Sequence, residues 1–317
     1  MARSYKFIIR RLLLVIPTML AVATVVFFLL NVVPGDIMTA LYGGIASPAQ
    51  LQQMRVSLGL SSPVYIRYFQ WLASIATGNL GYSLSTNTDV SSLIAYRLPV
   101  TLTLASVTML VAVAIAIPVG VISATRRNTK TDSALSVLSM VGLSVPSFYL
   151  GIVAILVFSI WFKVLPSGGY VPLFQDPISS LEHLFLPAAT LGVILAAYIM
   201  RMTRSSLLDV LSQEFILVLR AKGLSERTVL FRHALRNSLV TVVTAIGLQM
   251  SILLGGSLVI ENIFRIPGMG SLLLTAVADR DYLIVTAEVL VYAALIVAVN
   301  TAVDIVYTYL DPRIKLG

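Results

Sequence analysis

The chain contains six long stretches that are free, or almost free, of charged side chains. They cover residues 12–35, 98–125, 133–162, 184–200, 237–260 and 282–303, and only Glu288 interrupts the last of them. A helix needs about 20 mostly apolar residues to cross a bilayer, whereas barrel strands alternate in runs of about ten. The lengths therefore predict an all-α polytopic membrane protein with six transmembrane helices.

Composition indicates the same class of protein. Charged residues make up 11% of the chain and hydrophobic residues 58%, whereas soluble domains carry about 25% charged residues. These values exclude a disordered chain, a nucleic-acid-binding domain and an ordinary soluble enzyme. Because the chain has no cysteine and only two histidines, we expect no disulfide framework, no metal site and no bound cofactor.

The first apolar stretch follows four basic residues, as a secretory signal would. A cleaved signal has an apolar core of about 7–15 residues, whereas this stretch has 24. We therefore expect an uncleaved first helix, and a cleaved signal is the alternative. Lysine and arginine then set the orientation, because sixteen lie in alternate segments that start with the N-terminus and six lie in the others. The positive-inside rule places both termini in the cytoplasm.

The predicted outer loop, residues 36–97, contains two helix starts. Ser47-Pro48-Ala49-Gln50 is a capping-box pattern with proline at the first helical position. Ser62-Pro63 precedes an aromatic run that includes Tyr65, Tyr68, Phe69 and Trp71. Such aromatic side chains pack on the outer rim of a helix bundle or form a docking surface for an outer partner. We favour packing.

The loop between the fourth and fifth stretches, residues 201–236, is unusual because it is both basic and periodically apolar. The apolar spacing predicts two helices with a break at residues 222–225. Gly223 suits the left-handed position after a helix, and Ser225 suits the cap of the next. The alternative is a solvated basic loop that contacts anionic lipid.

Two short motifs in this loop are Arg220-Ala221-Lys222-Gly223-Leu224 and His233-Ala234-Leu235-Arg236-Asn237. They resemble the coupling segment of ABC importer permeases, in the dipeptide, oligopeptide and nickel branch. Further motifs of that branch follow in the same order along the chain. They are NVVPGD at 31–36, GNLGYS at 78–83, SVPSF at 144–148, ENIF at 261–264, PGMG at 267–270 and N-x3-D-x2-Y-x3-DPR at 300–313. The set is similar to the first-type permease subunit, which has the long outer loop.

The resemblance implies the ABC type I importer permease fold in a bacterial cytoplasmic (inner) membrane. It divides the chain into a first helix with its outer loop (1–97), a five-helix core (98–310) with the coupling loop at 205–237, and a cytoplasmic tail (311–317). The implied partners are a second homologous permease, two ATP-binding subunits, an extracytoplasmic substrate-binding protein and membrane lipid. No phosphate-binding loop occurs in the sequence, so we expect a non-catalytic subunit and ATP hydrolysis on separate subunits.

The resemblance also suggests site residues. Coupling to the ATPase is expected at Glu214, Ala221, Lys222, Gly223, Leu224, His233 and Asn237. The small residues of the fifth stretch, with Gln249, Ser251 and Gly255, suggest a substrate path, and plain helix packing is the alternative. Glu288 is expected to face that path, or else to reach polar headgroups. Asn300 and Asp304 are expected to have structural polar roles.

Two other classes of protein remain to be distinguished. A secondary transporter typically has inverted repeats and ionisable residues at mid-membrane, and the chain shows no evident repeat. A membrane-embedded enzyme needs clustered acid, base or nucleophile side chains, which no pair of stretches offers. The branch moves dipeptides, longer peptides, glutathione, nickel chelates and some sugars, so the sequence leaves the substrate open.

Overall fold

The computed structural model describes residues 2–32, 47–57, 61–83 and 85–310. The elements are α1 (Ala2–Val32), α3 (Pro48–Ser57), α4 (Val64–Ala76), β1 (Tyr82–Ser83), β2 (Thr88–Asp89), α5 (Val90–Thr125), α6 (Lys130–Ser144), α7 (Ser147–Ala154), the π-helix η1 (Ile155–Trp161), α8 (Pro177–Leu211), α9 (Glu214–Ala221), α10 (Glu226–Thr228), the π-helix η2 (Val229–Ala234), α11 (Leu235–Gly256), α12 (Leu258–Ile263), α13 (Met269–Ala278) and α14 (Tyr282–Leu310). The predicted PGD and DPR motifs lie outside the described residues.

Four helices in the described part of the chain are long and apolar enough to cross a membrane. They are Val90–Thr125, Pro177–Leu211, Glu226–Gly256 and Tyr282–Tyr307. The pair α6 and α7–η1 is bent by 98°, and it makes a fifth span if the two halves are counted as one. Helix α1 contributes a shorter apolar stretch, Leu13–Leu29. The all-helical membrane fold is therefore confirmed, and the count of six spans agrees with it but stays a prediction.

The third predicted span is not a straight helix. α6 ends at Ser144, and Pro146 caps α7 with an extended backbone. Proline disfavours helical backbone at the residue before it and removes a hydrogen-bond donor. The structure turns the chain by 98° there, although residues 133–162 form one apolar stretch in the sequence.

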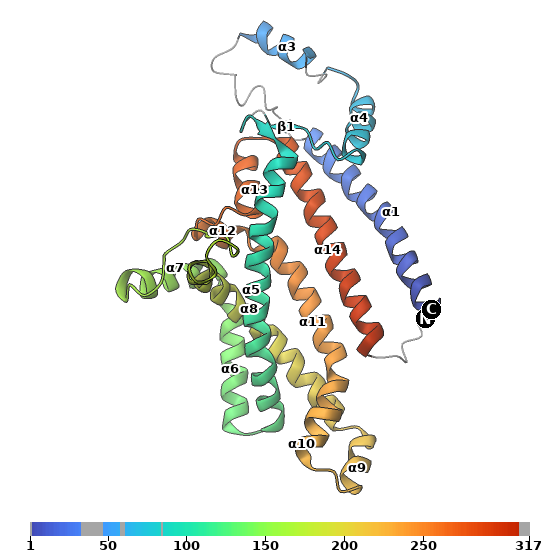
Figure 1. Cartoon of the computed structure of the whole chain (residues 1–317), viewed down its shortest axis with the longest axis vertical. Helices are drawn as coiled ribbons and strands as arrows, with labels where there is room; N and C mark the ends of the chain where they lie inside the picture. The colour runs from blue at the N-terminus through green and yellow to red at the C-terminus, as the bar shows by residue number, and fades with distance from the viewer. Residues whose placement is uncertain (1, 33–46, 58–60, 84, 311–317) are drawn as a thin grey trace.

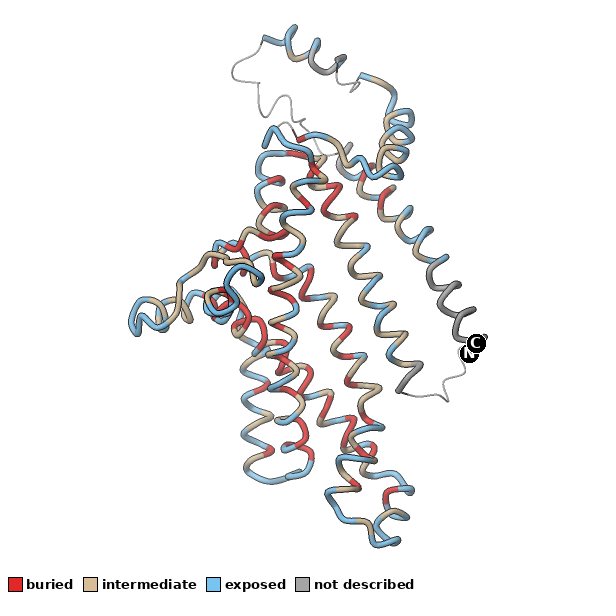
Figure 2. The backbone as a smooth tube through the Cα atoms, viewed as in Figure 1, coloured by how far each residue is buried: buried red, intermediate tan, exposed pale blue. Residues whose placement is uncertain are grey.

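The core lies where α5, α8 and α11 face one another, and Figure 2 shows buried residues concentrated along these faces. Small residues let α5 and α8 approach each other closely. A β-carbon at Gly120 would lie 2.7 Å from Cβ of Thr203, and one at Gly192 would lie 3.0 Å from Cγ1 of Val111. Close approach through small residues is the usual basis of helix packing in membranes.

The outer segment packs on the bundle in two places. Ser47 and Gln50 form the predicted capping box, with Ser47 N donating to Gln50 Oε1 at 2.8 Å. In α4, Tyr68 and Trp71 stack on Phe27 of α1 at 5.3 and 5.2 Å between ring centroids. Packing is therefore confirmed for these two rings, while a docking role for the exposed side of α4 stays untested.

A short antiparallel hairpin, β1–β2, precedes α5. It is fixed to the start of α14, because Ser83 and Ser85 donate to Oδ2 of Asp281 at 2.6 and 2.8 Å. Figure 1 shows this hairpin, α3 and α4 at one end of the bundle and α9 and α10 at the other. The start of α1 and the end of α14 lie away from the hairpin end, which agrees with both termini on one side.

Candidate functional site

The helical unit that follows α8 differs in one boundary from the sequence prediction. We expected one helix before the break at residues 222–225, but α8 ends at Leu211 and α9 begins at Glu214. Gln213 is extended, and Oγ of Ser212 donates to the carbonyl of Asp209 at 2.7 Å. The predicted coupling loop, 205–237, therefore starts inside α8. The sequence did not predict this boundary, because serine and glutamine only weakly indicate the end of a helix.

The turn after α9 has the predicted geometry. Gly223 has a φ of +79°, and Leu224 N donates to the carbonyl of Leu219 at 3.3 Å. Ser225 caps α10 through its hydroxyl. Arg220 also makes a two-pronged ion pair with Glu226, with N–O distances of 2.8 and 3.1 Å. The break at residues 222–225 is thus a defined turn, as a Schellman-type helix end requires.

The second half of the unit is a π-helix, η2, that leads into α11. Asn237 Nδ2 donates to the carbonyl of His233 at 2.8 Å. His233 and Leu224 are half-buried, whereas Asn237 and the expected coupling residues Glu214, Ala221, Lys222 and Gly223 are exposed. Single-turn π-helices often lie at functional sites.

The unit from α9 to η2, called here the coupling unit (residues 214–234), has a buried side and an exposed apolar side. On the buried side, Ile216, Val229 and Ala234 pack with Leu207 of α8 and Val121 of α5. Other apolar side chains of the unit remain exposed. They are Leu217 at 63%, Val218 at 52% and Phe231 at 54% of their full area. Exposed apolar groups at an end of the bundle that holds many charges indicate a protein contact.

An ion pair next to the coupling unit was not predicted from the sequence. Arg204 of α8 donates to both carboxylate oxygens of Asp132, each at 2.7 Å. Asp132 also accepts from the Ser123 hydroxyl at 2.6 Å and from the Asn128 amide at 3.1 Å. Charge-assisted, two-pronged pairs of this kind are among the stronger polar contacts in proteins. The pair therefore joins α8 to the α5–α6 turn.

The fifth predicted span, 237–260, ends halfway across the bundle. A β-carbon at Gly247 would collide with Val303, and Tyr307 donates a hydrogen bond to Thr244, so α11 and α14 run antiparallel in a fixed register. In that register Gly256, the last residue of α11, is level with Ala294. Ala294 lies near the centre of the Tyr282–Tyr307 span, about 18 Å from its outer end at 1.5 Å per residue. α11 therefore ends near the middle of the α14 span, and the short helix α12 follows it after Ser257.

The residues predicted for a substrate path differ in how far they are exposed near the end of α11. Gly255 is exposed, and a β-carbon there would meet nothing within 4 Å. Ser251 is half-buried, with its hydroxyl donating to the Gly247 carbonyl at 3.1 Å, and Gln249 is buried. Gly247 is a packing position against α14. Of the predicted set on α11, Gly255 is thus the one that the fold leaves open.

Glu288 does not lie where the sequence placed it. Its exposed fraction is 0% within this chain, and it interacts electrostatically with Glu261 and Arg97. A residue that faces a path or a headgroup needs an open side, so we correct both interpretations for this conformation. Apolar neighbours on its own helix gave no sign that Arg97 of α5 and Glu261 of α12 would lie near it.

The remaining polar residues of the last helix lie at its inner half. Asn300 is exposed and lines a groove between α1 and α14 with Leu14 and Thr18. Asp304 is half-buried. Within the described ranges, no group of three or more histidine, aspartate or glutamate side chains could hold a metal ion.

Comparison with known proteins identifies the family. Residues 116–316 match the model of the binding-protein-dependent transport system inner membrane component, and residues 4–105 match the N-terminal model of such membrane components. The chain belongs to this permease family. The coupling unit and the junction between α11 and α12 thus belong to a transport permease.

Similar proteins span nearly the whole permease. A putative peptide transport system permease protein of Brucella abortus is 42% identical over 308 residues, which is 97% of this chain and 98% of the relative. The oligopeptide transport system permease protein AppB of Bacillus subtilis is 39% identical over 312 residues, or 98% and 99% of the two chains.

Among solved structures, an inward-facing MetNI methionine ABC transporter matches with a TM-score of 0.57 and 21% identity. The match covers 69% of this permease and 96% of the MetNI chain. At that identity the likeness shows the fold alone. It confirms the expected fold of an ABC importer permease.

Proposed function

We propose that this permease carries peptides across a bacterial cytoplasmic membrane as one subunit of an ATP-driven importer. Two relatives that cover almost its full length are named as peptide or oligopeptide permeases. The wider set of substrates of this branch, which includes glutathione and nickel chelates, is kept as the alternative. A binding protein outside the membrane would deliver the substrate.

The coupling unit is the proposed contact with an ATP-binding subunit. The observation that carries this assignment is the exposed apolar side formed by Leu217, Val218 and Phe231. Its opposite side is fixed to α5 and α8, so a force applied to the unit reaches two long helices. A movement of the ATPase would therefore move the bundle as a rigid body, which is a common form of domain motion.

The substrate path is proposed to run along the exposed side of the α11 break. α11 ends there at Gly256, and α12 begins two residues later at Leu258. Gly255 and Gly256 are exposed in this chain, so the second permease and the path would cover them. Other transporter classes also form substrate sites at breaks in their helices.

Reconstitution tests the proposed function. We would purify the permease with its companion permease, ATP-binding subunits and binding protein, and place the complex in liposomes. We expect uptake of a labelled tripeptide that needs ATP hydrolysis and the binding protein. Uptake by the permease without ATP-binding subunits, driven by a proton or sodium gradient, would contradict the proposal and support a secondary transporter.

A further inference from the structure

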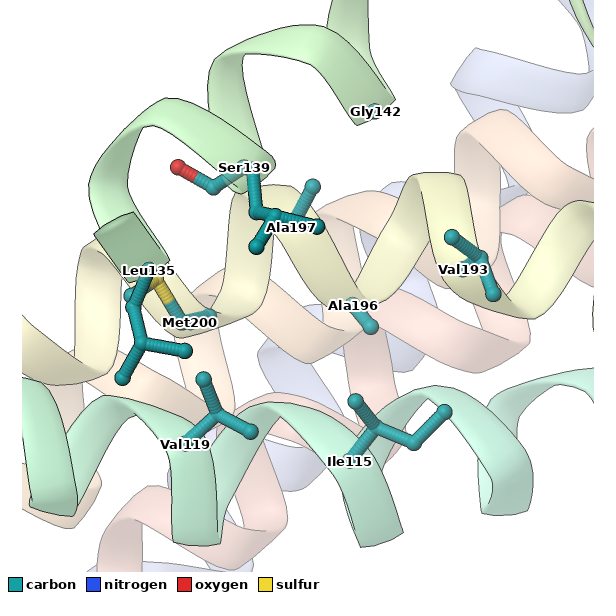
Figure 3. A pocket seen from close by; sticks show the side chains of 10 residues that line it. Ile115, Val119, Leu135, Ser139, Gly142, Val193, Ala196, Ala197 and Met200 are labelled. Carbon is teal, nitrogen blue, oxygen red and sulfur yellow. The ribbon is translucent and has the colours of Figure 1, made fainter. Parts of the chain in front are cut away.

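Two cavities flank the contact between α6 and α8, and they differ in chemistry. The first, of about 200 Å³, lies between α5, α6 and α8 and is lined almost entirely by apolar side chains, as Figure 3 shows. The second, of about 350 Å³, has Ser136 and Ser139 on one wall and Arg201, Arg204 and Ser205 on the other. Polar groups are thus gathered in the second cavity, called here the serine–arginine cavity.

The charge of this cavity comes from one arginine. The charge of Arg204 is balanced by Asp132, because its Nε and Nη2 donate to the two carboxylate oxygens. Arg201 is exposed, and within the described residues it has no ion pair or hydrogen bond through its side chain. The hydroxyls of Ser136 and Ser205 likewise have no partner among the described residues. A free guanidinium between two free hydroxyls is a set of donors suited to a phosphate group.

The position of the cavity favours a membrane lipid, rather than a soluble anion, as the ligand. Arg201 lies one helical turn from Arg204, towards the middle of the membrane. Arg126, Arg127 and Lys130 lie beyond the pair, on the side that the basic residues assign to the cytoplasm. Next to the cavity, α6 exposes Val137, Met140 and Val141. A phosphate bound at Arg201 would therefore have an apolar strip beside it for acyl chains.

We propose that the serine–arginine cavity binds the phosphate of an anionic phospholipid from the cytoplasmic leaflet. The Arg201 guanidinium and the hydroxyls of Ser136 and Ser205 donate to the phosphate oxygens. The acyl chains lie along the exposed strip of α6. The site adjoins the Arg204–Asp132 pair, so a bound lipid contacts the same part of α8 that supports the coupling unit. This inference does not depend on which substrate the permease carries.

The test compares two arginines that differ in their place. The whole complex would be placed in nanodiscs of phosphatidylcholine with a minor fraction of phosphatidylglycerol, and retained lipid would be counted by native mass spectrometry. Arg201→Gln removes the cavity cation. Arg127→Gln removes an exposed cation at the same end of the bundle, outside the cavity, and is the matched control. Ser205→Ala tests a hydroxyl without changing the charge.

We expect Arg201→Gln to lose one retained phosphatidylglycerol per permease and to bind it about fivefold more weakly, as the removal of one basic contact predicts. Ser205→Ala should give a smaller loss, and Arg127→Gln should retain the lipid. Equal losses for the two arginine variants would overturn the site in favour of diffuse attraction. Displacement of the lipid by inorganic phosphate would assign the cavity to a soluble anion. A disulfide between a cysteine introduced at Ser205 and a cysteine introduced in the second permease would show that the cavity lies at a subunit interface. That result would overturn the lipid site.

Discussion

Glu261 of α12 and Glu288 of α14 are both fully buried and interact electrostatically, yet only Glu261 is hydrogen-bonded. Glu261 accepts from the Thr101 hydroxyl at 2.8 Å, the Ser257 hydroxyl at 3.2 Å and the Ser271 amide at 3.1 Å. Neither carboxylate oxygen of Glu288 has a hydrogen-bond partner in the described part of the chain. We therefore expect replacement of the two acids to have opposite effects on stability.

Glu261→Gln should destabilise the permease. The amide would present a donor where the carboxylate now accepts, which leaves a buried group unsatisfied at a cost of about 1–3 kcal/mol. Glu288→Met removes a buried ionisable group without a hydrogen-bond partner and keeps an unbranched shape. Apolar replacement of buried charged groups is often neutral or stabilising by about 1–4 kcal/mol. Thermal unfolding in detergent should show a lower midpoint for the first variant and an equal or higher midpoint for the second. A loss of stability in both would refute this difference.

Gly223→Val should uncouple ATP hydrolysis from transport while the permease still inserts. A β-carbon at Gly223 would meet nothing within 4 Å, so the cost is backbone strain at a φ of +79°, about 1–2 kcal/mol for a residue other than glycine. Gly223→Asn is the matched control, because asparagine tolerates the left-handed region. Substrate-stimulated ATPase activity of the complex is the measurement. Wild-type stimulation in the valine variant would remove Gly223 from the coupling argument.

Leu217→Glu should weaken the contact with the ATP-binding subunit. The side chain is 63% exposed, so the change leaves the fold of the chain intact but places a charge in an apolar interface. Co-purification of the ATP-binding subunits should fall, while the yield of the two permeases stays constant. Asp209→Asn, at an exposed site outside the coupling unit, serves as the control. Full recovery of ATP-binding subunits with Leu217→Glu would place the interface elsewhere.

Gly255→Leu and Gly247→Val test whether each glycine lines the substrate path or packs against another helix. At Gly247 a larger side chain meets Val303, so we expect a lower thermal midpoint. At Gly255 the chain leaves open space, so we expect normal stability of the permease and reduced uptake. Reduced stability with Gly255→Leu and full uptake by the assembled complex would show that the position does not line the path.

Cysteine labelling tests the topology without interference, since the chain has no cysteine of its own. A cysteine at Ser91, just after the β1–β2 hairpin, should react with an impermeant reagent added outside the cell. A cysteine at Thr129, in the exposed α5–α6 turn, should react only after the membrane is opened. The reverse pattern would invert the orientation that the basic residues predict.

The sequence predicts those features that depend on local pattern. The lengths of the apolar stretches located the spans. Ser47 and Gln50 predicted a capping box, and Gly223 predicted a left-handed turn. The end of α11 at Gly256 was not predicted, because residues 237–260 form one apolar run, although the pair Gly255-Gly256 is a local signal for a helix end. The following helix, α12, makes a contact that no local pattern shows, because Thr101 donates to Glu261, 160 residues away in the sequence. The burial of Glu288 likewise depends on helices that only the fold brings together.

Peptide uptake tests the central account most directly. Liposomes that contain both permeases and the ATP-binding subunits would receive the binding protein, a labelled tripeptide and either ATP or a non-hydrolysable analogue. The account predicts accumulation against the gradient with ATP and none with the analogue, and it predicts loss of accumulation when Leu217→Glu is introduced. Accumulation driven by a proton or sodium gradient in the absence of ATP-binding subunits would contradict it.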